Sequence, residues 1–205
     1  MTALAMVFLA GINWRIIGAG IVGAAVAIPL YVRFGLHDYQ RRRIMTFFDP
    51  SADQMNTGYH ITQSKIALGS GGMSGKGYMQ GTQRQLDYVP ENETDFIFTV
   101  IGEEFGFVGG LITMSLYAAL IAMCVWMALQ CRHMFSRLLI LGLTTTFALY
   151  VFINLAMVMG LAPVVGVPLP LISYGGTVIL TVMLAFGLML SAHLYRQSEL
   201  PKGGR

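Results

Sequence analysis

Five carboxylates lie close together in the middle of the chain, immediately before a long stretch without charge: Glu91, Glu93, Asp95, Glu103 and Glu104. Thr94 and Asp95 directly precede an apolar run, residues 96–101. Helix chemistry alone favours Asp95 as an N-cap, because a short acidic side chain there accepts bonds from free N–H groups and complements the helix dipole. The alternative is catalytic. A carboxylate where a polar loop enters a membrane is partly desolvated, which makes it a stronger general base.

Glu103 and Glu104 are interpreted as acids of the first helical turn or as partners of loop arginines. A divalent cation, Mg²⁺ or Mn²⁺, is the alternative ligand for these two carboxylates. The histidines are scattered without ligand spacing, and the two cysteines, Cys124 and Cys131, are expected to be small packing residues.

A glycine-rich segment, residues 69–77, contains one lysine, Lys76. It does not match a phosphate-binding loop, because that motif needs glycine where Ser70 stands and Ser or Thr where Gly77 stands. The segment is therefore expected to be a flexible turn that lets the backbone pass close to membrane or substrate.

Basic and aromatic residues are mixed over residues 36–48, which include Arg41 and Arg42. This mixture is typical of an interfacial helix that lies on the bilayer. Anchoring to lipid headgroups is the simpler role for these arginines, and contact with a pyrophosphate-bearing lipid is the alternative.

The elements that must position these residues are membrane spans. The chain is 55% hydrophobic and only 11% charged, whereas soluble domains carry about 25% charged residues. No Asp, Glu, Lys or Arg occurs from Leu138 to Tyr195, and three prolines between residues 162 and 170 must divide that stretch into two helices. The sequence predicts a partial span at 1–12, spans at 16–34, 97–129, 138–161 and 171–195, an outer loop at 35–96 and a tail at 196–205.

The expected fold is thus a single all-α polytopic membrane domain, a helical bundle with a large extracytoplasmic loop. Basic residues of the short loops, Arg15, Arg132 and Arg137, fall on the same side as the tail, which predicts that this side is cytoplasmic. A net charge of +3 without a long basic stripe argues against nucleic-acid binding.

Several motifs, in this order, resemble the SEDS (shape, elongation, division and sporulation) family of cell-wall glycan polymerases. The resemblance covers nearly the whole chain and is closer to the elongation branch, RodA, than to the division branch, FtsW. The motifs lie at residues 38–43, 58–65, 69–72, 75–77, 81–83, 90–98, 102–107 and 163–176.

The resemblance implies a partial SEDS fold and a peptidoglycan glycosyltransferase that joins lipid II units on the outer face of the bacterial cytoplasmic (inner) membrane during elongation and cell-shape maintenance. The family's essential aspartate maps onto Asp95. The histidine that usually precedes Thr-Asp is replaced by Glu93. Residues expected to contact substrate are Lys76, Arg41, Arg42, Glu91, Glu104 and Ser173.

The implied partners are lipid II, a class B penicillin-binding protein that crosslinks the glycan, and other proteins of the elongation complex. Two alternatives stay open: a carrier or flippase for lipid-linked precursors, and an inactive truncated fragment. A carrier more often needs ionisable groups inside its spans. The predicted spans 138–161 and 171–195 contain no Asp, Glu, Lys or Arg, which favours the polymerase.

Overall fold

The computed structural model describes residues 57–81 and 94–196, together with residues 6, 18–20, 22, 23, 25, 27 and 31; for residues 57–60 it describes the backbone only. The described chain is helical and has no strand. Its helices of more than a few residues are α4 (Thr57–Ser70), α6 (Ile97–Gln130), α7 (Met134–Val158) and α8 (Gly176–Leu194). The predicted all-α class is confirmed for this part of the chain.

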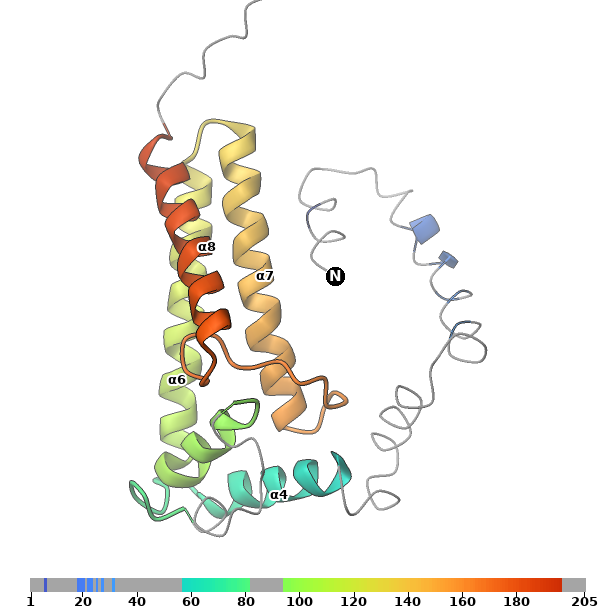
Figure 1. The fold of residues 1–205 in the computed structure, drawn as a ribbon, viewed down its shortest axis with the longest axis vertical. Coiled ribbons are helices and arrows are strands. Elements are labelled where there is room, and N and C mark those ends of the chain that lie inside the picture. The colour runs from blue at the N-terminus through green and yellow to red at the C-terminus, as the bar shows by residue number, and fades with distance from the viewer. Residues whose placement is uncertain are drawn as a thin grey trace, which may run out of the picture.

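Three of these helices, α6, α7 and α8, are long and apolar enough to cross a membrane. Figure 1 shows them side by side, with α4 lying across the end of the bundle where α6 begins and α7 ends. Their outward faces carry large apolar side chains such as Leu116, Trp126 and Leu180. Such faces suit lipid or neighbouring helices, because an aqueous surface of this composition would be unstable.

Two apolar clusters hold the bundle together. One, near α4, contains Phe96, Phe98, Tyr117, Phe147, Val151, Val158 and Leu169. The other, at the far end, contains Cys124, Met127, Ala128, Cys131, Ile140 and Met189. Both cysteines are buried and free, as expected for packing residues.

Helix α6 is interrupted at Gly106, so residues 97–129 are not one straight span. Gly106 has φ 66° and ψ −160°, a conformation that only glycine adopts readily. The break divides α6 into a short first segment, residues 97–105, and a long second segment, residues 107–130.

The glycine-rich loop, residues 71–81, replaces the backbone hydrogen bonds lost at this break. In an unbroken helix the amides of Phe107 and Val108 would bond to the carbonyls of Glu103 and Glu104. Here those amides donate to Gly72 O (2.9 Å) and Met73 O (3.2 Å). The freed carbonyls accept from Lys76 N and Gly77 N, at 3.0 Å each. The loop thus approaches the backbone of α6 closely, and its expected contact with membrane or substrate stays a prediction.

The connection between α7 and α8, residues 159–175, is the predicted proline-rich turn. Helix α8 starts at Gly176, after the predicted start at 171, because Leu171 has φ 70° and the residues before Gly176 form turns. The predicted span 16–34, most of the stub 1–12 and the interfacial segment 36–48 lie outside the described residues or are described only at isolated positions.

Candidate functional site

Asp95 lies at the entrance to α6, against the proline-rich turn. The helix is capped by Phe96, without a side-chain capping bond, so the expectation that Asp95 is the N-cap is wrong. Thr94, Asp95 and Phe96 form a turn, and the half-buried carboxylate of Asp95 lies beside Gly166. A Cβ atom at Gly166 would stand 3.3 Å from Asp95 Oδ2, and its φ of +77° also favours glycine.

Two buried polar side chains fasten the backbone of Thr94 and Asp95 to this turn; we call Asn154 and Ser173 the aspartate clasp. Asn154 Nδ2 donates to Asp95 O and to Val167 O, at 2.7 Å each. Ser173 Oγ donates to Thr94 O at 2.5 Å and accepts from Leu169 N at 2.7 Å. Each clasp residue therefore joins the entrance of α6 to the turn between α7 and α8.

A third polar contact fixes the next turn of α6. Thr99 Oγ1 lies 2.9 Å from Ser64 Oγ, which donates to Val158 O at 2.9 Å. Since the Ser64 proton is used on Val158, the Thr99 hydroxyl is the donor to Ser64. All three residues are buried, so this contact ties α4, α6 and α7 together.

The fourth contact is an ion pair. Lys76 Nζ lies 2.7 Å from Glu103 Oε1; the Glu103 side chain is 1% exposed and that of Lys76 is 27% exposed. Thr99 and Glu103 are four residues apart in the first α6 segment and therefore share one face of it. Glu103 and Glu104 lie beyond the first turn of α6, so their interpretation as first-turn acids is wrong; the helix starts at Ile97, several residues before them.

The structure describes three of the residues expected to contact substrate: Ser173, Glu104 and Lys76. Ser173 is 4% exposed, with its hydroxyl donating and accepting within the protein. Glu104 is buried, and Lys76 is paired with Glu103. Arg41, Arg42 and Glu91 lie outside the described residues. Within the described residues, no group of three or more His, Cys, Asp or Glu side chains could hold a metal ion.

Asn154 is the site residue that the sequence interpretation missed. It is the only amide side chain between Leu138 and Tyr195. A polar side chain inside an apolar span is costly unless it is bonded, and such residues are therefore often functional. That isolation was the available signal.

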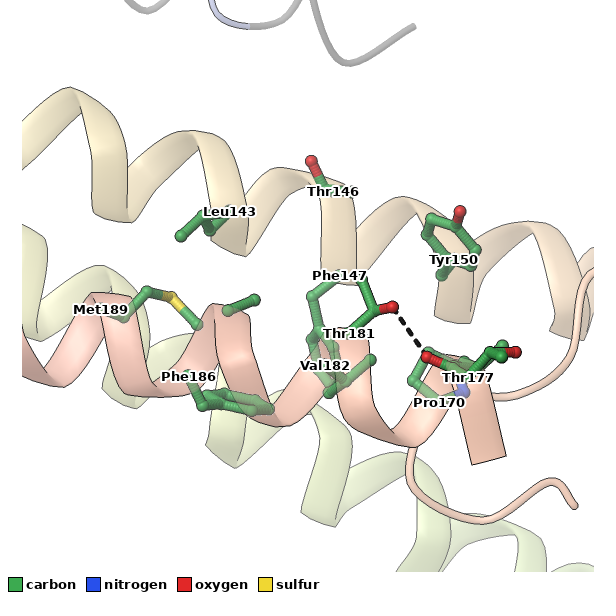
Figure 2. A pocket seen from close by; sticks show the side chains of 12 residues that line it. Leu143, Thr146, Phe147, Tyr150, Pro170, Thr177, Thr181, Val182, Phe186 and Met189 are labelled. Atoms are coloured by element: carbon green, nitrogen blue, oxygen red, sulfur yellow. Dashed lines mark hydrogen bonds between the residues drawn. The ribbon is translucent and has the colours of Figure 1, made fainter. Parts of the chain in front are cut away.

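An apolar cavity of about 240 Å³ lies between α7 and α8, beneath the same turn. Figure 2 shows Phe147 and Tyr150 from α7, Thr181 and Phe186 from α8, and Pro170 of the turn around it. Threonine hydroxyls in its wall bond to their own helices, as Thr146 does to Gly142 O, which leaves a largely apolar lining.

The family model described as "Cell cycle protein" for FtsW, RodA and SpoVE matches residues 1–198. The chain belongs to this family. It is 48% identical over 197 residues to the peptidoglycan glycosyltransferase MrdB of Escherichia coli K12, covering 96% of this chain and 53% of the relative. It is 37% identical to the peptidoglycan glycosyltransferase RodA of Treponema pallidum, covering 85% of this chain and 38% of that protein.

Two solved structures share the fold. One describes the structural coordination of polymerization and crosslinking by a peptidoglycan synthase complex, with a TM-score of 0.78 and 30% identity, covering 97% of this chain and 54% of that one. The other is a mutant of the rod shape determining protein RodA of Thermus thermophilus, with a TM-score of 0.53 and 34% identity, covering 65% and 41%. The chain spans about half the length of MrdB. The resemblance to the SEDS family is confirmed, and the chain is part of a multi-pass membrane protein.

Proposed function

We propose that this chain carries the catalytic carboxylate of a peptidoglycan glycosyltransferase that polymerises lipid II at the outer face of the inner membrane during elongation and shape maintenance. Three observations support the proposal. The family match covers nearly the whole chain, relatives at 48% and 37% identity are named peptidoglycan glycosyltransferases, and the backbone of Thr94 and Asp95 is held by contacts from two other parts of the fold.

The position of Asp95 carries the mechanism. Its backbone carbonyl is fixed by Asn154, and its carboxylate lies against Gly166 at the end of the bundle that α4 crosses. The backbone that carries this carboxylate is held by a buried side chain, and the Asp95 side chain itself is only half-buried. These are the requirements for a general base that must reach a substrate hydroxyl and remain oriented.

In the proposed reaction the 4-hydroxyl of an acceptor sugar attacks the anomeric carbon of a donor muramyl pyrophosphate lipid. Asp95 takes the hydroxyl proton, the new C–O bond forms, and the bond to the pyrophosphate breaks with its electron pair leaving on the phosphate oxygen. Basic side chains neutralise that charge. Since Lys76 is paired with Glu103, Arg41 and Arg42 are the stronger candidates for this role.

The apolar cavity between α7 and α8 suits a lipid tail. It lies beneath the turn that holds Asp95, and Tyr150, Thr177 and Phe186 are among the residues that line it (Figure 2). Its proximity to the turn would place the tail of a lipid-linked substrate within the bundle and its headgroup at the surface.

The proposed partner is a class B penicillin-binding protein that crosslinks the product, together with other elongation proteins. Support comes from the solved synthase complex, which couples polymerization and crosslinking and matches this fold with a TM-score of 0.78. Exposed apolar side chains on α6 and α8 offer surfaces for a partner helix.

The test is Asp95→Asn, measured in this chain alone and in a chimera in which the chain replaces the matching portion of E. coli MrdB. Loss of a general base lowers the rate about 100- to 10,000-fold, and the asparagine side chain preserves the size of the aspartate. We expect lost lipid II polymerisation with an unchanged melting temperature. Adding EDTA, and then Mg²⁺ or Mn²⁺, tests in the same assay whether polymerisation requires a divalent cation. Near-normal polymerisation by Asp95→Asn would exclude the catalytic role, and lipid II transport without polymerisation by the parent protein would favour a carrier.

A further inference from the structure

The hydrogen bonds to the backbone at Asp95 come from distant parts of the chain. Two segments that lie far along the chain from residues 94 and 95 converge on two consecutive carbonyls, those of Thr94 and Asp95. Asn154 comes from α7 and Ser173 from the turn before α8. Neither residue bonds to the Asp95 carboxylate in any contact described above, so their role concerns the backbone that carries it.

The Asn154 side chain suits this contact in its burial and in its two donor hydrogens. It is fully buried, and its amide nitrogen uses both hydrogens, one on Asp95 O and the other on Val167 O. Val167 is the neighbour of Gly166, which faces the carboxylate. One side chain thus sets the spacing between the base and the wall opposite it.

Because Asn154 is fully buried, its polar atoms depend on partners within the protein. Asn154 Oδ1 has no hydrogen-bond partner among the described residues, so the site keeps a fully buried amide although one of its polar atoms is unsatisfied. An apolar residue of similar size would avoid that cost. The other side chains of the span 138–161 are apolar or carry a hydroxyl. The presence of an asparagine among them is therefore explained by the two carbonyls to which its amide nitrogen donates.

We infer that Asn154, assisted by Ser173, is a positioning residue that sets the distance and orientation of Asp95 relative to the turn at residues 166–169. The inference rests on the proposed function for its kinetic consequence, and on geometry alone for its structural one. A misplacement of about 1 Å at a reacting group costs about 100-fold in rate.

The test uses Asn154→Leu, which keeps the approximate volume and removes both donated bonds, and Ser173→Ala. Thr144→Val is the matched control, because Thr144 is also buried in α7 and its hydroxyl is hydrogen-bonded to Ile140 O, Met189 Sδ and the Cys124 thiol, all away from the site. In the MrdB chimera, Asn154→Leu should lower kcat about 10- to 100-fold while KM for lipid II changes about twofold or less. Thr144→Val should keep the parent kcat.

Hydrogen–deuterium exchange supplies a readout that does not need activity. Asn154 donates only to carbonyls, so its replacement frees no backbone N–H directly. Faster exchange at residues 94–98 and 166–170 in Asn154→Leu would therefore report a loosened turn. Ser173→Ala should add a specific loss of protection at the Leu169 amide, which donates to Ser173 Oγ.

Unchanged exchange at both segments in a folded Asn154→Leu protein would overturn the inference, as would an equal fall in kcat for Thr144→Val. If Asn154→Leu does not fold, Ser173→Ala decides by the same two measurements. An active Asp95→Asn protein would remove the proposed catalytic role while leaving the exchange result to judge the clasp separately.

Discussion

The ion pair between Lys76 and Glu103 allows a quantitative test of how the glycine-rich loop is attached. Glu103 is almost completely buried, and its carboxylate lies 2.7 Å from the Lys76 ammonium. Removing one partner of a buried pair leaves an uncompensated charge, which costs about 3–5 kcal/mol. Because Lys76 is partly exposed, water can reach the carboxylate through the gap, and we expect the lower value.

Lys76→Met should therefore lower the free energy of unfolding by about 3 kcal/mol. For a chain of this size that corresponds to a fall in melting temperature of roughly 6–12 °C. Glu103→Met should cost about 1 kcal/mol, because the partly exposed Lys76 side chain can turn toward water. The double variant, with two apolar side chains in contact, should lie within about 1 kcal/mol of the parent, since replacing both charges is often neutral.

The assay is thermal unfolding in detergent, followed by fluorescence, with Lys65→Met as the control for losing an exposed lysine on α4. A coupling energy of about 3–5 kcal/mol between the two single variants would show that the ion pair attaches the loop to α6. If Lys76→Met melts like Lys65→Met, the reasoning is refuted.

The same series separates two roles for Lys76. If it only attaches the loop to α6, lipid II polymerisation by the double variant in the MrdB chimera should recover together with stability. If Lys76 instead holds the leaving pyrophosphate, as its sequence context suggested, activity should stay low while the melting temperature recovers.

Two further predictions address the backbone and the topology. Gly106→Ala should cost at least about 2 kcal/mol, because its φ of +66° is strained for alanine and the new Cβ would overlap Gly75 N and Met73 O; Gly110→Ala, with Phe98 at 3.5 Å, should be harmless by melting temperature. Equal melting of the two variants would show that the break at residue 106 is not required. Single cysteines at Gln80 and His133, in a protein without its two native cysteines, should be labelled by an impermeant thiol reagent at position 80 only in intact cells; labelling at 133 would reverse the orientation.

The sequence by itself determined the class of the protein. A long charge-free stretch divided by three prolines leaves no stable option except membrane helices, because backbone polar groups in lipid must be bonded within helices. The motifs around Asp95 and in the proline-rich turn were enough to indicate the family, since they combine rare residues in a fixed order. Burial of both cysteines followed from the same apolar pattern.

Tertiary structure decided what the polar residues do. Local rules assigned Asp95 to a helix cap, but its carbonyl accepts a hydrogen bond from Asn154, 59 residues away along the chain. The carbonyl of the preceding Thr94 accepts one from Ser173, 79 residues away from it. Glu103 was paired in expectation with arginines and is paired with Lys76, because the break at Gly106 lets the glycine-rich loop enter the helix and exchange hydrogen bonds with it. Periodicity and propensity describe neighbours within a few residues. Contacts such as these depend on how distant segments pack, and only the folded chain shows which buried donor meets which carbonyl.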